Sequence, residues 1–197
     1  MKKIIILALI IIVHFSLKIE DCSSQWVYQS LPSYYDVADI KFFDANTGLM
    51  IFSTSYHGML RTTNGGDNWI LLHPSLTFYQ LDKIDSTTLY AIGRWNGVDR
   101  IQRTYDKGLS WDSVSVSSNI AFTGLSFINH DTGWLSGANY LNYSTIWRTT
   151  DGGVTLTELM NNTGRGRLFF LKQKVNGEYV GWHYSYIADD KLWKTTN

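Results

Sequence analysis

One stretch decides the fold: Arg103-Thr104-Tyr105-Asp106-Lys107-Gly108-Leu109-Ser110-Trp111. Its core has the pattern T-x-D-x-G-x-S-W, which we call the box, and the chain comes close to repeating it three more times. Near-copies occupy residues 62–69 and 149–156, and another begins at residues 194–197. An internal repeat of this kind must be interpreted before any other motif, because it determines the architecture.

A basic residue precedes every copy and gives the period of the repeat. These residues are Arg61, Arg103, Arg148 and Lys194, so the steps are 42, 45 and 46 residues. A period of roughly 40–50 residues is typical of β-propeller blades. Short aromatic and β-branched runs between turn residues also predict strands, and no window has a sustained helical period. We predict an all-β β-propeller of four-stranded antiparallel blades, at about residues 37–73, 78–116, 121–160 and 165–197.

Each part of the box has a role in folding. An Asp or Asn side chain accepts hydrogen bonds from backbone N–H groups a few residues on, which holds a tight turn. Glycine supplies a positive φ, and a Trp ring can be buried as the next strand begins. The residues in these roles are Asn64, Gly66 and Trp69, then Asp106, Gly108 and Trp111, and then Asp151 and Gly153. We therefore expect the box to be a structural turn and not a catalytic site.

The box resembles the Asp-box, also called the BNR repeat, over about residues 37–197. This repeat occurs in sialidases, in sortilin-type receptor ectodomains and in propellers similar to photosystem II assembly factors. The resemblance implies a protein-binding or assembly module; the alternative is a carbohydrate-binding propeller or a sialidase-like glycoside hydrolase. A sialidase needs three arginines around a substrate carboxylate. Arg61, Arg103 and Arg148 lie on the third strand of each blade, away from the central channel, so we assign no catalytic residue.

The N-terminus has the three parts of a secretory signal. Lys2 and Lys3 form a basic start, residues 4–13 are an unbroken apolar run, and small residues stand before position 25. The apolar run is much shorter than the roughly 20 residues that span a bilayer, which disfavours the alternative of a signal anchor. We predict a signal peptide at 1–24 and an exported protein, periplasmic, cell-surface or secreted, with no transmembrane segment after cleavage. Lipid attachment at Cys22 is a further alternative.

Residues 25–32 resemble the strand that follows the first box, with Trp26 in the place of Trp69. We expect this segment to close the ring as the outer strand of the last blade, which removes an exposed sheet edge. The fourth box is interrupted at Asn197. We expect a fragment of a larger ring; the alternative is a four-bladed ring closed by residues 26–31.

The net charge and the spacing of the histidines and glycines disfavour several classes of ligand. The formal net charge is zero. Removing Lys2, Lys3 and Lys18 with Glu20 and Asp21 leaves 14 basic and 15 acidic residues, whereas nucleic-acid-binding domains usually carry a basic excess. The five histidines have no metal-ligand spacing, and no glycine motif for phosphate is present. We expect no nucleic acid, no metal and no cofactor.

The loops between the second and third strands of each blade lie opposite the box turns, and loops on a rigid scaffold usually carry binding. We predict the binding face from the residues of these loops: Tyr56, His57, Arg94, Trp95, Tyr140, Tyr143, His183 and Tyr184. Exposed Tyr and Trp offer a large contact area at low entropic cost. The alternative is that the rings cap the blade core. In blade four the second strand is predicted at residues 179–182, and Arg165-Gly166-Arg167 is interpreted as a solvated turn.

Overall fold

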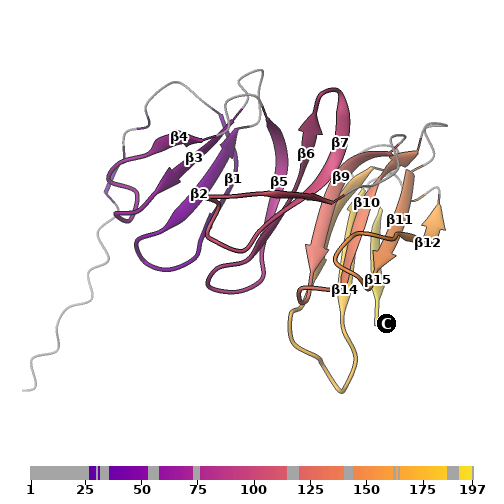
Figure 1. Cartoon of the computed structure of the whole chain (residues 1–197). Helices are drawn as coiled ribbons and strands as arrows, with labels where there is room; N and C mark the ends of the chain where they lie inside the picture. The colour runs from indigo at the N-terminus through magenta and orange to yellow at the C-terminus, as the bar shows by residue number, and fades with distance from the viewer. Residues whose placement is uncertain are drawn as a thin grey trace, which may run out of the picture.

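The computed structural model of the protein consists of β-strands joined by turns (Figure 1). It describes residues 27–29, 31, 36–52, 58–72, 76–114, 120–139, 144–161, 163, 165–185 and 191–196. These ranges contain strands, turns and irregular segments and no helix. The predicted all-β class is confirmed for the described chain.

The strands form four antiparallel sheets, in which each strand pairs with the next along the chain. Blade one contains β1 (Val37–Phe42), β2 (Gly48–Phe52), β3 (Met59–Thr62) and β4 (Ile70–Leu72). Blade two contains β5 (Thr77–Lys83), β6 (Leu89–Trp95), β7 (Val98–Thr104) and β8 (Asp112–Val114). Blade three contains β9 (Ile120–Phe127), β10 (Gly133–Asn139), β11 (Ser144–Thr149) and β12 (Thr157–Asn161). Blade four has three strands among the described residues, β13 (Gly166–Phe170), β14 (Gly181–Ser185) and β15 (Leu192–Thr195).

The four sheets are arranged as the blades of a propeller, with the first strand of each blade innermost. β1 packs against β5, β5 against β9, and β9 against β13. Figure 1 shows β1–β4 on one side of the molecule, blade two beside them, and the strands of blades three and four together on the other side. The predicted β-propeller architecture is therefore confirmed.

Apolar clusters between neighbouring blades form the core. Between blades two and three, the rings of Tyr90 and Phe127 stack with their centroids 4.0 Å apart. Between blades three and four, the rings of Trp134 and Phe170 stack with their centroids 3.8 Å apart. Each buried aromatic ring removes on the order of 150–250 Å² from water, so these contacts contribute strongly to the association of the blades.

Carboxylates on the innermost strands link blade one to blade two and blade two to blade three. Asp39 accepts a hydrogen bond from the backbone N–H of Leu81 at 3.0 Å, and Asp82 accepts one from Phe127 at 2.6 Å. Burial raises the pKa of Asp82, and the nearby Lys172 ammonium, 2.9 Å away, opposes that shift. Buried polar groups are costly without a partner, so these bonds favour one alignment of the blades.

The box forms a tight turn closed by its own side chains. Thr104 Oγ1 donates to Asp106 Oδ1 at 2.8 Å and accepts from the Gly108 N–H at 2.9 Å. Ser110 donates from its backbone N–H to Asp106 Oδ1 at 2.9 Å and from its hydroxyl to Oδ2 at 2.5 Å. Lys107 and Gly108 have positive φ, 60° and 85°. The copies in blades one and three make corresponding bonds, so the described boxes serve the fold.

The second strand of blade four lies further along the chain than predicted. It was expected at residues 179–182, whereas β14 spans Gly181–Ser185. A short turn closed by backbone hydrogen bonds between Val175 and Glu178 lengthens the connection from β13, so the strand begins later. His183 and Tyr184, which were predicted in a loop, therefore lie within a strand.

Of the ring-closing strand predicted at residues 25–32, the structure describes residues 27–29 and 31, so ring closure stays a prediction. Residues 27–29 are exposed and lie outside any strand, and the last sheet contains only β13, β14 and β15 among the described residues. Leu31 packs on the apolar cluster of blade one that contains Met50, Phe52 and Leu60, as does Trp69. This contact covers apolar surface of blade one that would otherwise be exposed to water. The predicted signal peptide lies outside the described residues.

Candidate functional site

A basic cleft lies at the edge of the propeller opposite the box turns. Its volume is about 380 Å³, and it is lined by Tyr79, Arg94, Asp99, Ala121, Phe122, Thr123, Arg165 and Arg167. These residues come from the beginnings of β5, β7, β9 and β13 and from the end of β6. Blades two, three and four therefore meet at this cleft.

A buried carboxylate organises one side of the cleft. The side chain of Asp99 is only 2% exposed, and its Oδ1 lies 2.7 Å from Nε of Arg94. Its Oδ2 accepts the backbone N–H of Phe122 at 3.0 Å, and Oδ1 also accepts the Tyr79 hydroxyl at 3.4 Å. The hydrogen bond from Arg94 to Asp99 raises the pKa of that guanidinium. Arg94 is thus held in place while half of its side chain remains exposed.

The other side of the cleft is built around Gly166. Its carbonyl accepts hydrogen bonds from the hydroxyls of Thr123 at 2.9 Å and Ser136 at 2.7 Å. A Cβ at this position would overlap the backbone carbonyl of Tyr184, so only glycine fits. The clamped Gly166 places its two neighbours, Arg165 and Arg167, at the cleft. The interpretation of this segment as a solvated turn is corrected, because Gly166 and Arg167 belong to an innermost strand.

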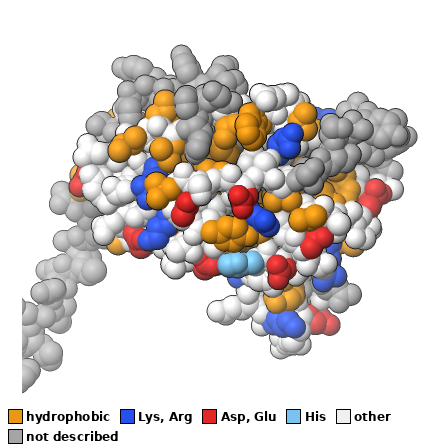
Figure 2. Space-filling model, viewed as in Figure 1, with side chains coloured by type: hydrophobic (Ala, Val, Ile, Leu, Met, Phe, Trp, Pro, Cys, Tyr) orange, Lys and Arg blue, Asp and Glu red, His pale blue; other side chains and the backbone are white. Residues whose placement is uncertain are grey.

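The charges in the cleft favour an anionic ligand. Three guanidinium groups and one carboxylate line it, which leaves a net charge of two positive. On the face shown in Figure 2, by contrast, acidic and basic side chains are interspersed and neither sign forms a continuous patch. Guanidinium groups match the planar geometry of carboxylates, which they can bind through two parallel hydrogen bonds.

Tyr79 is suited to hydrogen bonding and not to nucleophilic attack. Burial raises the pKa of Tyr79, and the charge of Asp99 raises it further. The phenol therefore stays protonated at neutral pH, where it can donate a hydrogen bond. A tyrosine nucleophile would need the opposite shift, toward the ionised form.

Comparisons with known proteins agree with the fold. No family model matches the chain, and no curated protein matches it significantly. Among solved structures, YCF48 bound to D1 peptide aligns with a TM-score of 0.56 and 16% identity over 85% of this chain and 56% of that one. The GH74 enzyme of Niastella koreensis aligns with a TM-score of 0.58 and 14% identity, over 82% and 28%. The GH74 xyloglucanase of Xanthomonas campestris aligns with 0.59 and 11%, over 82% and 30%.

The chain is similar to these proteins as a β-propeller. At such low identity the likeness establishes the fold alone, and this chain spans about half the length of the YCF48 chain. The neighbours include a protein captured with a peptide and two glycoside hydrolases. These similarities support a propeller fold. What the propeller binds has to be inferred from the residues of the cleft.

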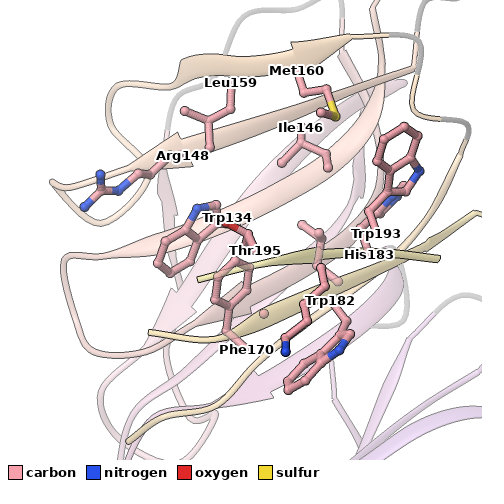
Figure 3. A pocket seen from close by; sticks show the side chains of 13 residues that line it. Trp134, Ile146, Arg148, Leu159, Met160, Phe170, Trp182, His183, Trp193 and Thr195 are labelled. Carbon is pink, nitrogen blue, oxygen red and sulfur yellow. The ribbon is translucent and has the colours of Figure 1, made fainter. Parts of the chain in front are cut away.

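Of the predicted binding residues, Arg94 is the one that lines the cleft. Trp95 is 43% exposed at the end of β6, next to Arg94. Tyr184 is 47% exposed and pairs with Arg167 in the sheet. His183 is buried, 2% exposed, and lines a different groove, shown in Figure 3. The remaining predicted residues, Tyr56, His57, Tyr140 and Tyr143, lie outside the described residues.

The described residues contain no cluster of three or more His, Cys, Asp or Glu side chains that could hold a metal ion. Nor do they include a helix long and apolar enough to cross a membrane.

Proposed function

We propose that the chain is an exported, non-catalytic propeller that binds another protein by holding a carboxylate in the basic cleft. The observation that carries the proposal is the convergence on one cleft of Arg94 from blade two with Arg165 and Arg167 from blade four. The ligand that fits is an acidic peptide segment or the C-terminus of a partner chain, since either presents carboxylates that an extended backbone can bring to the arginines.

The Asp-box resemblance and the N-terminal sequence support the wider part of the proposal. The repeated box resembles the Asp-box, and residues 1–24 have the pattern of a secretory signal. The similar fold of YCF48 bound to D1 peptide supports a peptide-binding role by analogy.

A second candidate is binding or hydrolysis of an acidic sugar, because the same three arginines fit a sugar carboxylate and Tyr79 stands beside the carboxylate of Asp99. The raised pKa of Tyr79 favours binding over catalysis. The carboxylate of Asp99 already accepts from Arg94 and from the backbone of Phe122, which leaves it poorly placed to activate a nucleophile.

The test is a titration with defined peptides. A fluorescent ten-residue peptide rich in Asp and Glu, with a free C-terminus, is compared with an uncharged peptide of the same length. The variant combines Arg165→Ala with Arg167→Ala; Arg94 is kept because it neutralises the buried Asp99, and removing it would leave an uncompensated charge. Lys174→Ala, an exposed cation on the β13–β14 turn, is the control.

We expect the double variant to weaken binding by about 10-fold or more, since each charged hydrogen bond contributes about 1.5–3 kcal/mol. The control should bind as the parent does, and the affinity should fall as salt rises. Equal binding by the parent and the double variant would contradict the proposal. Release of sialic acid from a fluorogenic substrate, lost in the double variant, would establish the second candidate instead.

A further inference from the structure

The charges in the basic cleft are unevenly distributed among its three blades. Blade two contributes Arg94 together with Asp99, and Nε of Arg94 lies 2.7 Å from Oδ1 of Asp99. This pair is neutral as a unit. Blade three contributes residues 121–123, which carry no charge, and blade four contributes Arg165 and Arg167 without an acidic residue. The excess positive charge of the cleft therefore belongs to its blade-four side.

Two β-bulges turn hydroxyl groups toward the cleft. The pairing of β5 with β6 leaves out Tyr79, and the pairing of β9 with β10 leaves out Thr123. A bulge re-aims a side chain and often lies next to an active site. Opposite the first bulge, a Cβ on Gly93 would overlap the backbone carbonyl of Thr77, so the sequence keeps the space that this bulge needs. Both of the left-out residues line the cleft.

The hydroxyl of Thr123 is already used in the fold, whereas that of Tyr79 can turn to a ligand. Thr123 donates to the carbonyl of Gly166 at 2.9 Å. The hydroxyl of Tyr79 lies 3.4 Å from Asp99 Oδ1, which is longer than the roughly 2.5–3.0 Å typical of hydroxyl donors. The same oxygen accepts a shorter bond, 2.7 Å, from Arg94. Tyr79 therefore loses little when its proton turns to a better acceptor.

The blade-two side of the cleft suits a neutral acceptor. Nε of Arg94 donates to Asp99, and half of the Arg94 side chain remains exposed, so its other N–H groups can reach a ligand. Burial raises the pKa of Tyr79, and its hydroxyl therefore keeps its proton at neutral pH. Because the charge of Asp99 offsets that of Arg94, these donors gain less from an anion than the arginines of blade four do. A peptide carbonyl is an uncharged acceptor that fits them.

We propose that Arg165 and Arg167 hold the carboxylate of the ligand while Tyr79 and Arg94 donate hydrogen bonds to a backbone carbonyl beside it. The cleft then recognises an acidic group as part of a polypeptide, and Tyr79 is a residue that determines this specificity. The carboxylate belongs to an acidic side chain or to a chain end, since both stand close to a peptide carbonyl. This inference rests on the proposed function, because it requires that the cleft binds an acidic peptide.

The first test removes the hydroxyl of Tyr79. Tyr79→Phe keeps the ring, which packs against the apolar core between blades two and three, and loses one long hydrogen bond, so the variant should fold. We expect it to bind the acidic ten-residue peptide about 3–10-fold more weakly in anisotropy titrations, as for the loss of one uncharged hydrogen bond. Tyr105→Phe, at an exposed position of a box turn on the opposite edge, is the matched control and should bind as the parent does.

Salt separates the two sides of the cleft. The slope of log affinity against log salt concentration should be the same for Tyr79→Phe and the parent, because the hydroxyl carries no charge. The Arg165→Ala and Arg167→Ala double variant should have a shallower slope. If Tyr79→Phe reduced the slope as much as the double variant does, Tyr79 would hold the carboxylate itself, and the assignment of the carbonyl would be overturned.

Small competitors test the carbonyl with the protein unchanged. N-acetylglutamate α-amide presents a side-chain carboxylate beside peptide carbonyls, N-acetylglycine presents a chain end beside one, and butyrate presents a carboxylate alone. Each is added to the complex of the full chain with the labelled acidic peptide at constant ionic strength. We expect one of the first two to displace the peptide at a concentration about 10-fold lower than butyrate does. Which of the two does so identifies the source of the carboxylate.

Two further results would overturn the inference and leave the proposed function standing. One is unchanged affinity in Tyr79→Phe, and the other is equal displacement, or none, by all three competitors, while the arginine double variant still weakens binding of the acidic peptide. Equal binding by the parent and the double variant would instead contradict the proposed function and this inference with it.

Discussion

Replacing Asp106 by Ala tests whether the box serves the fold or a ligand. The carboxylate accepts four hydrogen bonds, from the Thr104 hydroxyl, from the backbone N–H groups of Leu109 and Ser110, and from the Ser110 hydroxyl. A hydrogen bond contributes about 0.5–1.5 kcal/mol net. Three of these four bonds are solvent-exposed, so water replaces part of each, and we expect a total loss of about 2 kcal/mol.

Asp106→Asn is the matched control, because Asn64 holds the same position in the first box. The amide keeps one acceptor, as Asn64 does for Thr62 and Asn68, and loses the oxygen that accepts from the Ser110 hydroxyl. We expect it to cost about 0.5–1 kcal/mol. For a chain of this size 1 kcal/mol corresponds to roughly 2–4 °C in melting temperature, so the Ala variant should melt about 4–8 °C lower and the Asn variant about 2 °C lower.

Circular dichroism during heating measures both effects, and pH provides an internal check. Burial raises the pKa of Asp106, but hydrogen bonds from Ser110 and Thr104 outweigh it and the pKa is lowered. The stabilisation is therefore present above the unfolded pKa of 3.8 and is lost as pH falls through the lower folded value. The difference in melting temperature between the parent and the Ala variant should therefore disappear at acidic pH. An Ala variant that melts like the parent at neutral pH would refute the structural role.

Other predictions address the blade interfaces. Trp134→Ala removes the stack on Phe170 and should cost about 3–5 kcal/mol in urea unfolding; a loss below 1 kcal/mol would contradict the packing described. Gly166→Ala forces a Cβ against the Tyr184 carbonyl and should weaken acidic-peptide binding in anisotropy titrations, whereas unchanged affinity would mean that Gly166 does not position the arginines. Because burial lowers the pKa of His183 below 6.5, the unfolded chain binds the proton first and stability should fall as pH drops below 6.5. Urea midpoints at pH 7.5 and 5.5 should therefore converge in His183→Gln, and an unchanged difference would point to other groups.

The repeat made the fold predictable. The spacing of the box fixed the blade period, and its Asp, Gly and Thr residues form local bonds that depend on few distant contacts. For the same reason the turn at Asp106 could be interpreted from the sequence alone. Elements with local causes of this kind are the ones that a sequence pattern identifies best.

The cleft was not predictable in the same way. Asp99, Phe122 and Arg167 lie on three different blades, and a single-blade pattern does not show which positions converge. The sequence offered one indication of the cleft: Arg165 and Arg167 lie at the start of an innermost strand. His183 was misplaced because the turn at 175–178 shifts its strand along the chain.

The central claim is that the box turns stabilise the propeller while the opposite edge binds the ligand. One paired measurement tests it: melting temperature and acidic-peptide affinity, recorded for Asp106→Ala and for the Arg165→Ala and Arg167→Ala double variant. We predict that Asp106→Ala melts about 4–8 °C lower and binds the peptide normally at a temperature where it is folded. The double variant should melt like the parent and lose about 10-fold or more in affinity. The reverse pattern, in which the box variant loses binding and the arginine variant does not, would contradict the account.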